Sequence, residues 1–239
     1  VSMILGSQLF AENTNTLLEE ITISQEQSNS ASNNVTEGTG SYTTKSMKTA
    51  TKLDLSIRET PQSIVVITKQ QMEDFNYTSL EDIINNTAGL NPSKFGTESV
   101  YMTARGFEID YYQIDGIPTS RYTPVIDLSI YDRIEVVKGA NGLMTGAGNP
   151  AASINMVRKH ANSKEFTGKA TISAGSWDTY RGDFDISTPL NSDGSVRGRI
   201  VSSYGEKDSY KNYYSKDTTV LYGVVDSDIS DNTKVSVGA

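Results

Sequence analysis

The chain has 239 residues, 36% of them hydrophobic, which is enough to build a folded core. Its formal net charge is -8 and its isoelectric point is about 4.8, and this acidity argues against a nucleic-acid partner, because proteins that bind nucleic acids present basic surfaces to the phosphates. The absence of cysteine excludes disulfide bonds, thiol chemistry and cysteine-ligated zinc.

The first segment, residues 1–11, is mostly apolar and ends on Ala11. This composition is typical of the rear part of a secretory signal peptide, and the alternative is a short buried strand or helix. No run reaches the roughly 20 apolar residues that a transmembrane helix requires. We therefore expect any contact with a membrane core to be made by β-strands.

Residues 12–51 are rich in Ser, Thr, Asn, Gln and Glu, and such a segment buries too little apolar surface to offset the entropy of ordering it. We expect a flexible leader. Within it, residues 18–24 read LEEITIS, an alternation at the period of a β-strand. This segment could pair with the edge of a partner's sheet, and chance alternation in a linker is the alternative.

Residues 52–160 predict a compact α+β domain with short helices and a small mixed sheet. Thr68 and Ser79 are each positioned to cap the start of a short helix, and Asp82 completes a variant of the capping box. Short strands follow, and the Asp-Gly pair at residues 115–116 predicts a hairpin turn with positive φ.

Residues 166–239 consist of consecutive strand-length runs in which apolar and polar residues alternate, joined by short and longer turns in succession. This pattern is typical of outer-membrane β-barrels, and an antiparallel sandwich is the alternative. The smallest membrane barrels need about eight strands. We therefore expect this segment to be the beginning of a barrel that is incomplete within this sequence.

Glycines recur between Gly139 and Gly148, as in phosphate-binding loops. A phosphate loop requires a lysine directly after a glycine and a helix behind it, whereas a strand pattern containing Ile154 and Met156 follows here. His160, the single histidine, is expected to be a linker residue, and no hydrolase or zinc-protease motif occurs. The sequence therefore predicts neither catalysis, nor a nucleotide site, nor protein ligands for a metal.

Four further segments occur in a fixed order along the chain: residues 60–74 (TPQSIVVITKQQMED), 80–90 (LEDIINNTAGL), 104–118 (ARGFEIDYYQIDGIP) and 131–159 (YDRIEVVKGANGLMTGAGNPAASINMVRK). Together they resemble the plug domain of TonB-dependent outer-membrane receptors, in particular the ferric-siderophore branch. Residues 166–190 resemble the first barrel hairpin of the same branch, and residues 18–24 look like its periplasmic contact segment, the TonB box.

The resemblance implies a plug inside an outer-membrane barrel of about 22 strands, with the leader in the periplasm. The implied partners are a ferric siderophore on the outside, the lipid of the outer membrane, and the TonB protein, which is energised by the inner membrane and pulls on the leader. TonB would add a strand at Glu20, Ile21, Thr22, Ile23 and Ser24. Iron would arrive inside its chelator, so no cofactor is expected.

In this family, arginines at the positions of Arg105 and Arg133 lock the plug to the barrel wall, for which the arginine fork is suited. The alternative is pairing inside the plug with Glu135 or Asp132. A siderophore would be met by aromatic and basic side chains of the outward loops, for which the candidates are Phe95, Tyr101, Arg121 and Tyr122. Ordinary loop aromatics remain the alternative.

The sequence thus predicts a TonB-dependent receptor that imports ferric siderophores. The alternative is a soluble periplasmic or secreted binding module with a β-rich tail.

Overall fold

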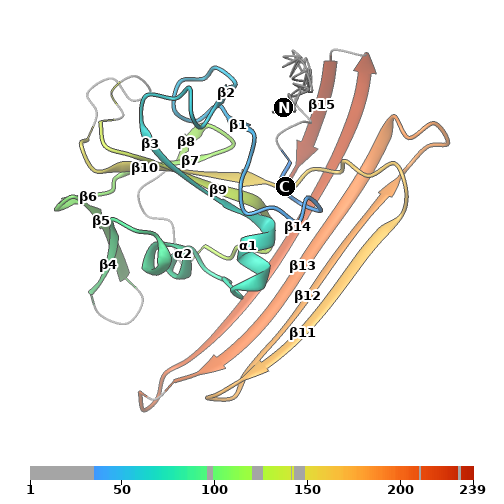
Figure 1. The fold of residues 1–239 in the computed structure, drawn as a ribbon. Helices are drawn as coiled ribbons and strands as arrows, with labels where there is room; N and C mark the ends of the chain where they lie inside the picture. The colour runs from blue at the N-terminus through green and yellow to red at the C-terminus, as the bar shows by residue number, and fades with distance from the viewer. Residues whose placement is uncertain are drawn as a thin grey trace, which may run out of the picture.

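The computed structural model describes residues 35–95, 99–119, 126–140, 142, 149–209, 211–230 and 233–239. These residues form two parts, an N-terminal unit built around a mixed sheet and a single antiparallel sheet of long strands (Figure 1). Within these ranges, no helix is long and apolar enough to cross a membrane.

The N-terminal unit is organised around a five-stranded sheet in the order β3-β9-β10-β7-β8. Its strands are β3 (Ser63–Thr68), β7 (Tyr111–Ile114), β8 (Ile117–Thr119), β9 (Tyr131–Lys138) and β10 (Ala152–Arg158). β10 runs parallel to β7, and the other neighbours are antiparallel. The predicted small mixed sheet is therefore confirmed.

Two smaller sheets lie at opposite ends of this unit (Figure 1). At one end β1 (Ser46–Met47) pairs with β2 (Leu55–Ser56). At the other end β4 (Leu90–Phe95), β5 (Ser99–Ala104) and β6 (Phe107–Glu108) form a three-stranded sheet. The β1–β2 pair therefore marks one end of the unit, and the sheet of β4, β5 and β6 marks the other.

The two helices begin where the sequence predicts. The Thr68 side chain accepts a hydrogen bond from the Gln71 amide at the start of α1 (Lys69–Asp74). Ser79 and Asp82 form a reciprocal capping box at the start of α2 (Leu80–Asn86), which satisfies amides that have no partner inside the helix.

The helices bury Met72, Ile83 and Ile84 against the apolar side chains of the central sheet, so that one core holds the unit together. The hairpin turn between β7 and β8 has φ values of 50° at Asp115 and 78° at Gly116, as expected for an Asp-Gly turn.

Residues 35–51 pack onto the N-terminal unit, although their polar composition predicts a flexible leader. Met47 is buried beside Val66 and Val137, and the amide and the hydroxyl of Thr36 both donate to Asp132. The prediction fails for these residues because it counts only apolar burial, whereas here polar groups find partners in the folded unit. The signal-like segment 1–11 and the rest of the leader lie outside the described residues.

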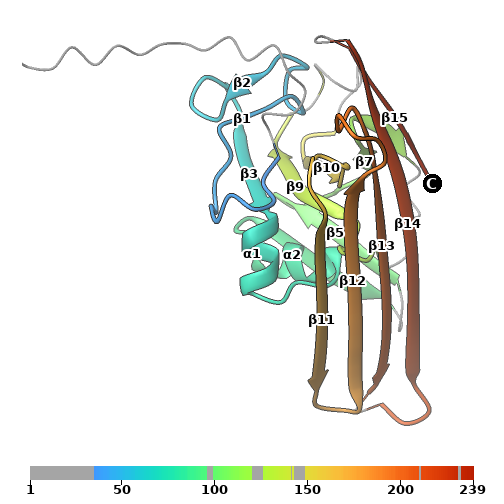
Figure 2. The same ribbon diagram turned by 90° about the vertical axis from the view of Figure 1, so that its right-hand side faces the viewer.

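The second part is a five-stranded meander in which each strand pairs with the next one along the chain. Its strands are β11 (Thr167–Gly175), β12 (Thr179–Pro189), β13 (Val196–Asp208), β14 (Ser215–Ser230) and β15 (Thr233–Gly238). Figure 2 shows the strands side by side, with the N-terminal unit against one face of the sheet.

The two faces of this sheet have opposite character. Along β13, Arg197, Arg199 and Val201 are buried, whereas Ile200 is 61% exposed. The outer face carries further exposed large apolar side chains at Ile172, Phe184, Ile186, Leu221 and Val225. In a β-sandwich a second sheet would cover this face, and no sheet formed by the described residues lies against it. Charged groups inside and apolar groups outside are typical of a membrane barrel wall.

Candidate functional site

Charged side chains join the N-terminal unit to the sheet. Arg181 of β12 donates two hydrogen bonds to the carboxylate of Asp127, which lies in the segment before β9. The N–O distances are 2.7 and 3.0 Å. Arg181 also bonds Asp183 on its own strand. The bidentate geometry fixes the orientation of both groups as well as their distance.

A second arginine, Arg199 of β13, holds two carboxylates at once. It donates two hydrogen bonds of 2.6 Å to Glu37 of the leader, and it is bidentate with Asp185 of β12 at 2.6 and 2.7 Å. Lys159, just after β10, reaches the same Asp185 at 2.7 Å. The leader, the N-terminal unit and the sheet therefore meet at one cluster of charges.

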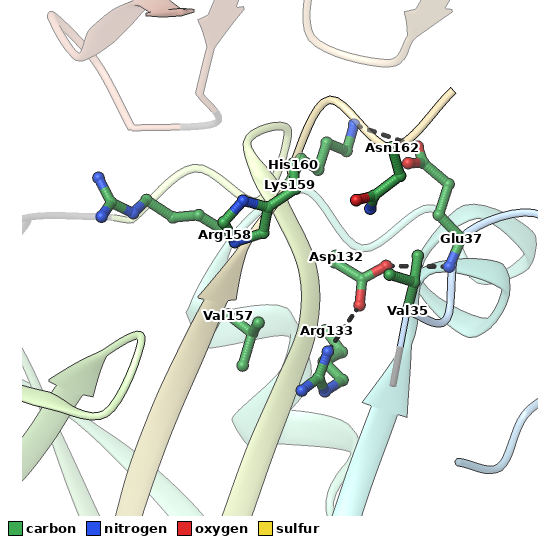
Figure 3. Close-up of a pocket in the computed structure, with 9 residues that line it drawn as sticks. All are labelled: Val35, Glu37, Asp132, Arg133, Val157, Arg158, Lys159, His160 and Asn162. Atoms are coloured by element: carbon green, nitrogen blue, oxygen red, sulfur yellow. Dashed lines mark hydrogen bonds and ion pairs between the residues drawn. The ribbon is translucent and has the colours of Figure 1, made fainter. Parts of the chain in front are cut away.

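Thr36, the residue before Glu37, is bound to the central sheet of the N-terminal unit. Asp132 accepts hydrogen bonds from the backbone amides of Thr36 and Glu37 at 2.9 to 3.1 Å, and the Thr36 hydroxyl donates to the Asp132 carbonyl. Figure 3 shows Glu37 and Asp132 beside a cavity that Arg133 and Lys159 also line. The volume of this cavity is about 90 Å³. Thr36 and Glu37 thus fasten the leader to two different parts of the fold.

Two acids of these contacts, Glu37 and Asp127, are held in the charged form. Burial would raise the pKa of Glu37, but the hydrogen bonds and charge of Arg199 outweigh it and hold this pKa below its ordinary value. Burial likewise opposes ionisation of Asp127, and the hydrogen bonds from Arg181 and Ser129 reverse the effect, so the pKa of Asp127 is also lowered.

Of the two predicted locking arginines, Arg133 is found in ion pairs inside the N-terminal unit. Its Nε lies 2.6 Å from Glu135 and its Nη1 lies 3.0 Å from Asp132. Glu135 and Asp132 are the partners expected for Arg133 under the alternative, in which it pairs inside the plug. A contact from Arg133 to strands beyond residue 239 stays a prediction.

Arg105 occupies the left-handed region with φ of 54°. Its guanidinium lies against the backbone of Gly139, where an added Cβ would come within 2.8 Å of Nη1. Gly139, with φ of 103°, therefore makes room for Arg105 at the beginning of the glycine-rich loop. The locking role of Arg105 is likewise still a prediction.

The ligand-binding candidates are placed only in part. Phe95 is the last residue of β4, and Tyr101 lies in β5, paired with Ser93 and 44% exposed. Both therefore belong to the small sheet at the end of the unit away from β1 and β2 (Figure 1). Arg121 and Tyr122 lie outside the described residues, as do Glu20, Ile21, Thr22, Ile23 and Ser24.

The glycine-rich loop joins two antiparallel strands, with Lys138 opposite Ala152. β10 follows the loop, as the strand pattern predicts, and residues 141 and 143–148 lie outside the described residues. Among the residues with described positions, no group of His, Asp and Glu side chains is arranged to hold a metal.

The sequence pattern alone did not indicate a role for Glu37, Asp127, Arg181 or Arg199. The one available signal was the run of arginines at alternate positions of β13, Arg197 and Arg199, on the face that Val201 shares. In a barrel strand that face points to the lumen, where Arg199 finds a partner in Glu37 and Arg197 finds one on the wall, in Asp228.

A mixed-sheet unit bound by ion pairs to one face of an antiparallel wall, which is apolar on its other face, defines a plug and the beginning of its barrel. Residues 56–153 match the family described as TonB-dependent Receptor Plug Domain. The chain therefore belongs to the TonB-dependent receptors, and it carries their plug followed by barrel strands.

Curated relatives support this assignment over most of the chain. It is 44% identical to the ferripyoverdine receptor of Pseudomonas aeruginosa over 212 residues, which is 86% of this chain and 26% of that receptor. It is 45% identical to the ferric-pyoverdine 358 receptor of Pseudomonas putida over 210 residues, which is 85% of this chain and 26% of the relative. The chain thus spans about a quarter of the length of these relatives.

Solved structures agree with the fold. The crystal structure of the Pseudomonas aeruginosa ferripyoverdine receptor bound to ferripyoverdine is similar with a TM-score of 0.80 and 42% identity, over 86% of this chain and 28% of that one. The alcaligin outer-membrane receptor FauA of Bordetella pertussis gives a TM-score of 0.77 and 41% identity, over 85% of this chain and 36% of that one.

Proposed function

We propose that this chain is the gating part of an outer-membrane receptor that imports ferric siderophores with energy supplied through TonB. The observation that carries the proposal is the plug bound to the inner face of barrel strands by Arg181–Asp127 and Arg199–Glu37. Such contacts hold a plug in place and are few enough to be rearranged. The names of the relatives support the cargo class.

The proposed orientation follows from the two ends of the unit. The end with β1, β2 and the leader would face the periplasm, where TonB would add a strand at residues 20–24. The end with β4, β5 and the loop after β13 would face outward and receive the siderophore (Figure 1). Iron would stay inside its chelator, so the protein would supply no ligand or cofactor.

The cargo is proposed at the level of a class. The chain is 42% identical to a solved ferripyoverdine receptor and 41% identical to the alcaligin receptor. Because these two identities are almost equal, they favour neither chelate over the other.

The test uses the receptor expressed from its own gene in iron-starved cells. Wild-type cells should bind and accumulate radioactive iron from at least one member of a panel that includes ferric pyoverdines, alcaligin and ferrioxamine B, and deletion of the gene should abolish this uptake. Failure to bind any chelate of the panel, with the receptor present in the outer membrane, would contradict the proposed cargo.

A further inference from the structure

We infer that Thr36 and Glu37, together with Asp132 and Arg199, form a latch that fastens the leader at once to the plug and to the barrel wall and is the first contact loaded when the leader is pulled. This inference rests on the proposed function, because it concerns how tension on the leader reaches the gate. We call these four residues the leader latch.

The latch joins three separate parts of the chain through two adjacent residues. Thr36 binds Asp132 of β9 through its amide and its hydroxyl, and Glu37 binds Arg199 of β13 through both carboxylate oxygens. β9 is the second strand of the central sheet, paired with both β3 and β10. A pull on the leader therefore acts on the plug's main sheet and on the barrel wall at the same point.

The latch comes first along the path of the force. Tension from residues before Val35 reaches Thr36 and Glu37 before it reaches β1 at residue 46 or β3 at residue 63. The latch consists of a few hydrogen bonds, whereas β9 is held by two complete ladders. The latch should therefore open while the sheet stays intact.

Opening should also be reversible, because each buried group keeps a second partner. When Glu37 leaves, Arg199 still holds Asp185 in a bidentate pair. When Thr36 leaves, Asp132 still accepts from Arg133 at 3.0 Å. Removing one partner from a buried pair is costly when it leaves a bare charge, and this arrangement avoids that cost.

The chain offers a matched control. Arg181 also binds two carboxylates, Asp127 of the plug and Asp183 of its own strand, just as Arg199 binds Glu37 and Asp185. Asp127→Asn therefore weakens a plug–wall pair of the same construction without touching the leader, and Glu37→Gln weakens the latch.

The experiment pulls single receptors, expressed from their own gene and reconstituted in a bilayer, by a handle attached to the leader before residue 35. Wild type should give a first rupture at short extension. Glu37→Gln should lower that force and raise spontaneous opening about tenfold, because two charge-assisted hydrogen bonds are weakened. Asp127→Asn should leave the first rupture unchanged. An unchanged rupture in Glu37→Gln, or an equal loss in both variants, would overturn the latch.

Hydrogen exchange provides the check on folding. In Glu37→Gln, the peptide that contains the Thr36 amide should exchange about tenfold faster, while the β9 peptide keeps its protection. Faster exchange in both would mean that Glu37 supports the whole plug, which would overturn the inference. Neither readout uses a siderophore or TonB, so the latch can fail while uptake persists, and uptake can fail while the latch holds.

Discussion

At the scale of single residues, the plug contains a buried acid whose bonds tie several segments together. Glu135 of β9 is 1% exposed and accepts from the Nε of Arg133. Its other carboxylate oxygen accepts a hydrogen bond from the hydroxyl of Thr49 and another, of 3.3 Å, from the side-chain amide of Asn155. A buried carboxylate is tolerated only when such partners surround it.

Glu135→Ala should destabilise the plug by about 1–3 kcal/mol, because it removes a buried hydrogen-bond acceptor of Thr49 and Asn155, while Arg133 keeps its ion pair with Asp132. The measurement is the free energy of opening of β9, taken from hydrogen exchange of the receptor in detergent. The control is Glu165→Ala, since Glu165 is exposed and should change that free energy by less than about 0.5 kcal/mol. Equal effects of the two variants would contradict the account of Glu135.

Lys69 gives a pH-dependent effect of defined sign. Burial lowers the pKa of its amino group from 10.5 to about 8, and the positive charge of Lys159 acts in the same direction. Between pH 8 and 10.5 the unfolded chain therefore binds more protons at this site than the folded one. The contribution of Lys69 to the free energy of unfolding therefore rises with pH between 8 and 10.5. Below pH 8 the buried positive charge lowers the free energy of unfolding.

Lys69→Met should therefore raise the midpoint of thermal unfolding of the plug at pH 7, and the difference from wild type should shrink as the pH approaches 10. Lys69 lies beside Glu73, with the two charged groups 3.8 Å apart, and Glu73 also pairs with Lys169, so Lys69→Met leaves that acid with a partner. A difference that stays constant from pH 7 to pH 10 would show that the Lys69 amine does not titrate in this range.

At the scale of the elements, the wall strands are defined by which side chains they turn outward. On β14, Leu221 is 75% exposed, while its neighbour Tyr222 is buried and donates a hydrogen bond to the Lys159 carbonyl. In the proposed setting the exposed row contacts the lipid of the outer membrane. The depth of each outward-facing residue in the bilayer then determines how much free energy of folding is lost when a charge is placed there.

Leu221→Lys should reduce folding of the barrel into a bilayer by about 2–4 kcal/mol, because it places a charge near the middle of the lipid face. Asp217→Lys, on the same face near the end of the strand, should have little effect. The fraction of receptor that keeps the altered electrophoretic mobility of a folded barrel reports both. Equal folding of the two variants would contradict a lipid-facing position for Leu221.

The elements were largely predictable because local rules determine them. The caps at Thr68 and Ser79 and the turn at residues 115–116 depend on residues close in sequence, and all three were found as predicted. The docking of the leader could not be predicted. Glu37 and its partner Arg199 are 162 positions apart, and a polar leader gives no apolar pattern to indicate such a contact.

Over the whole molecule, charged contacts between the wall and the plug are spread from α1 to the end of β10, and a small apolar cluster of Val201, Tyr222 and Val224 packs against Ile130. Lys169 of β11 reaches Glu73 of α1 at 2.6 Å, and Lys159 reaches Asp185 at 2.7 Å. Between plug and wall lies a cavity of about 280 Å³ with charged and apolar lining. A plug held by polar contacts around such a space can move relative to its wall at a lower cost than one held by a continuous apolar core.

In the proposed function, tension that TonB applies to the leader opens this gate. The most direct measurement compares the binding and the uptake of a radioactive ferric siderophore in cells whose receptor lacks residues 18–24. We expect surface binding to be unchanged and uptake to fall to the level of cells without TonB. Uptake that persists without these residues, or surface binding that is lost together with uptake, would contradict this proposal.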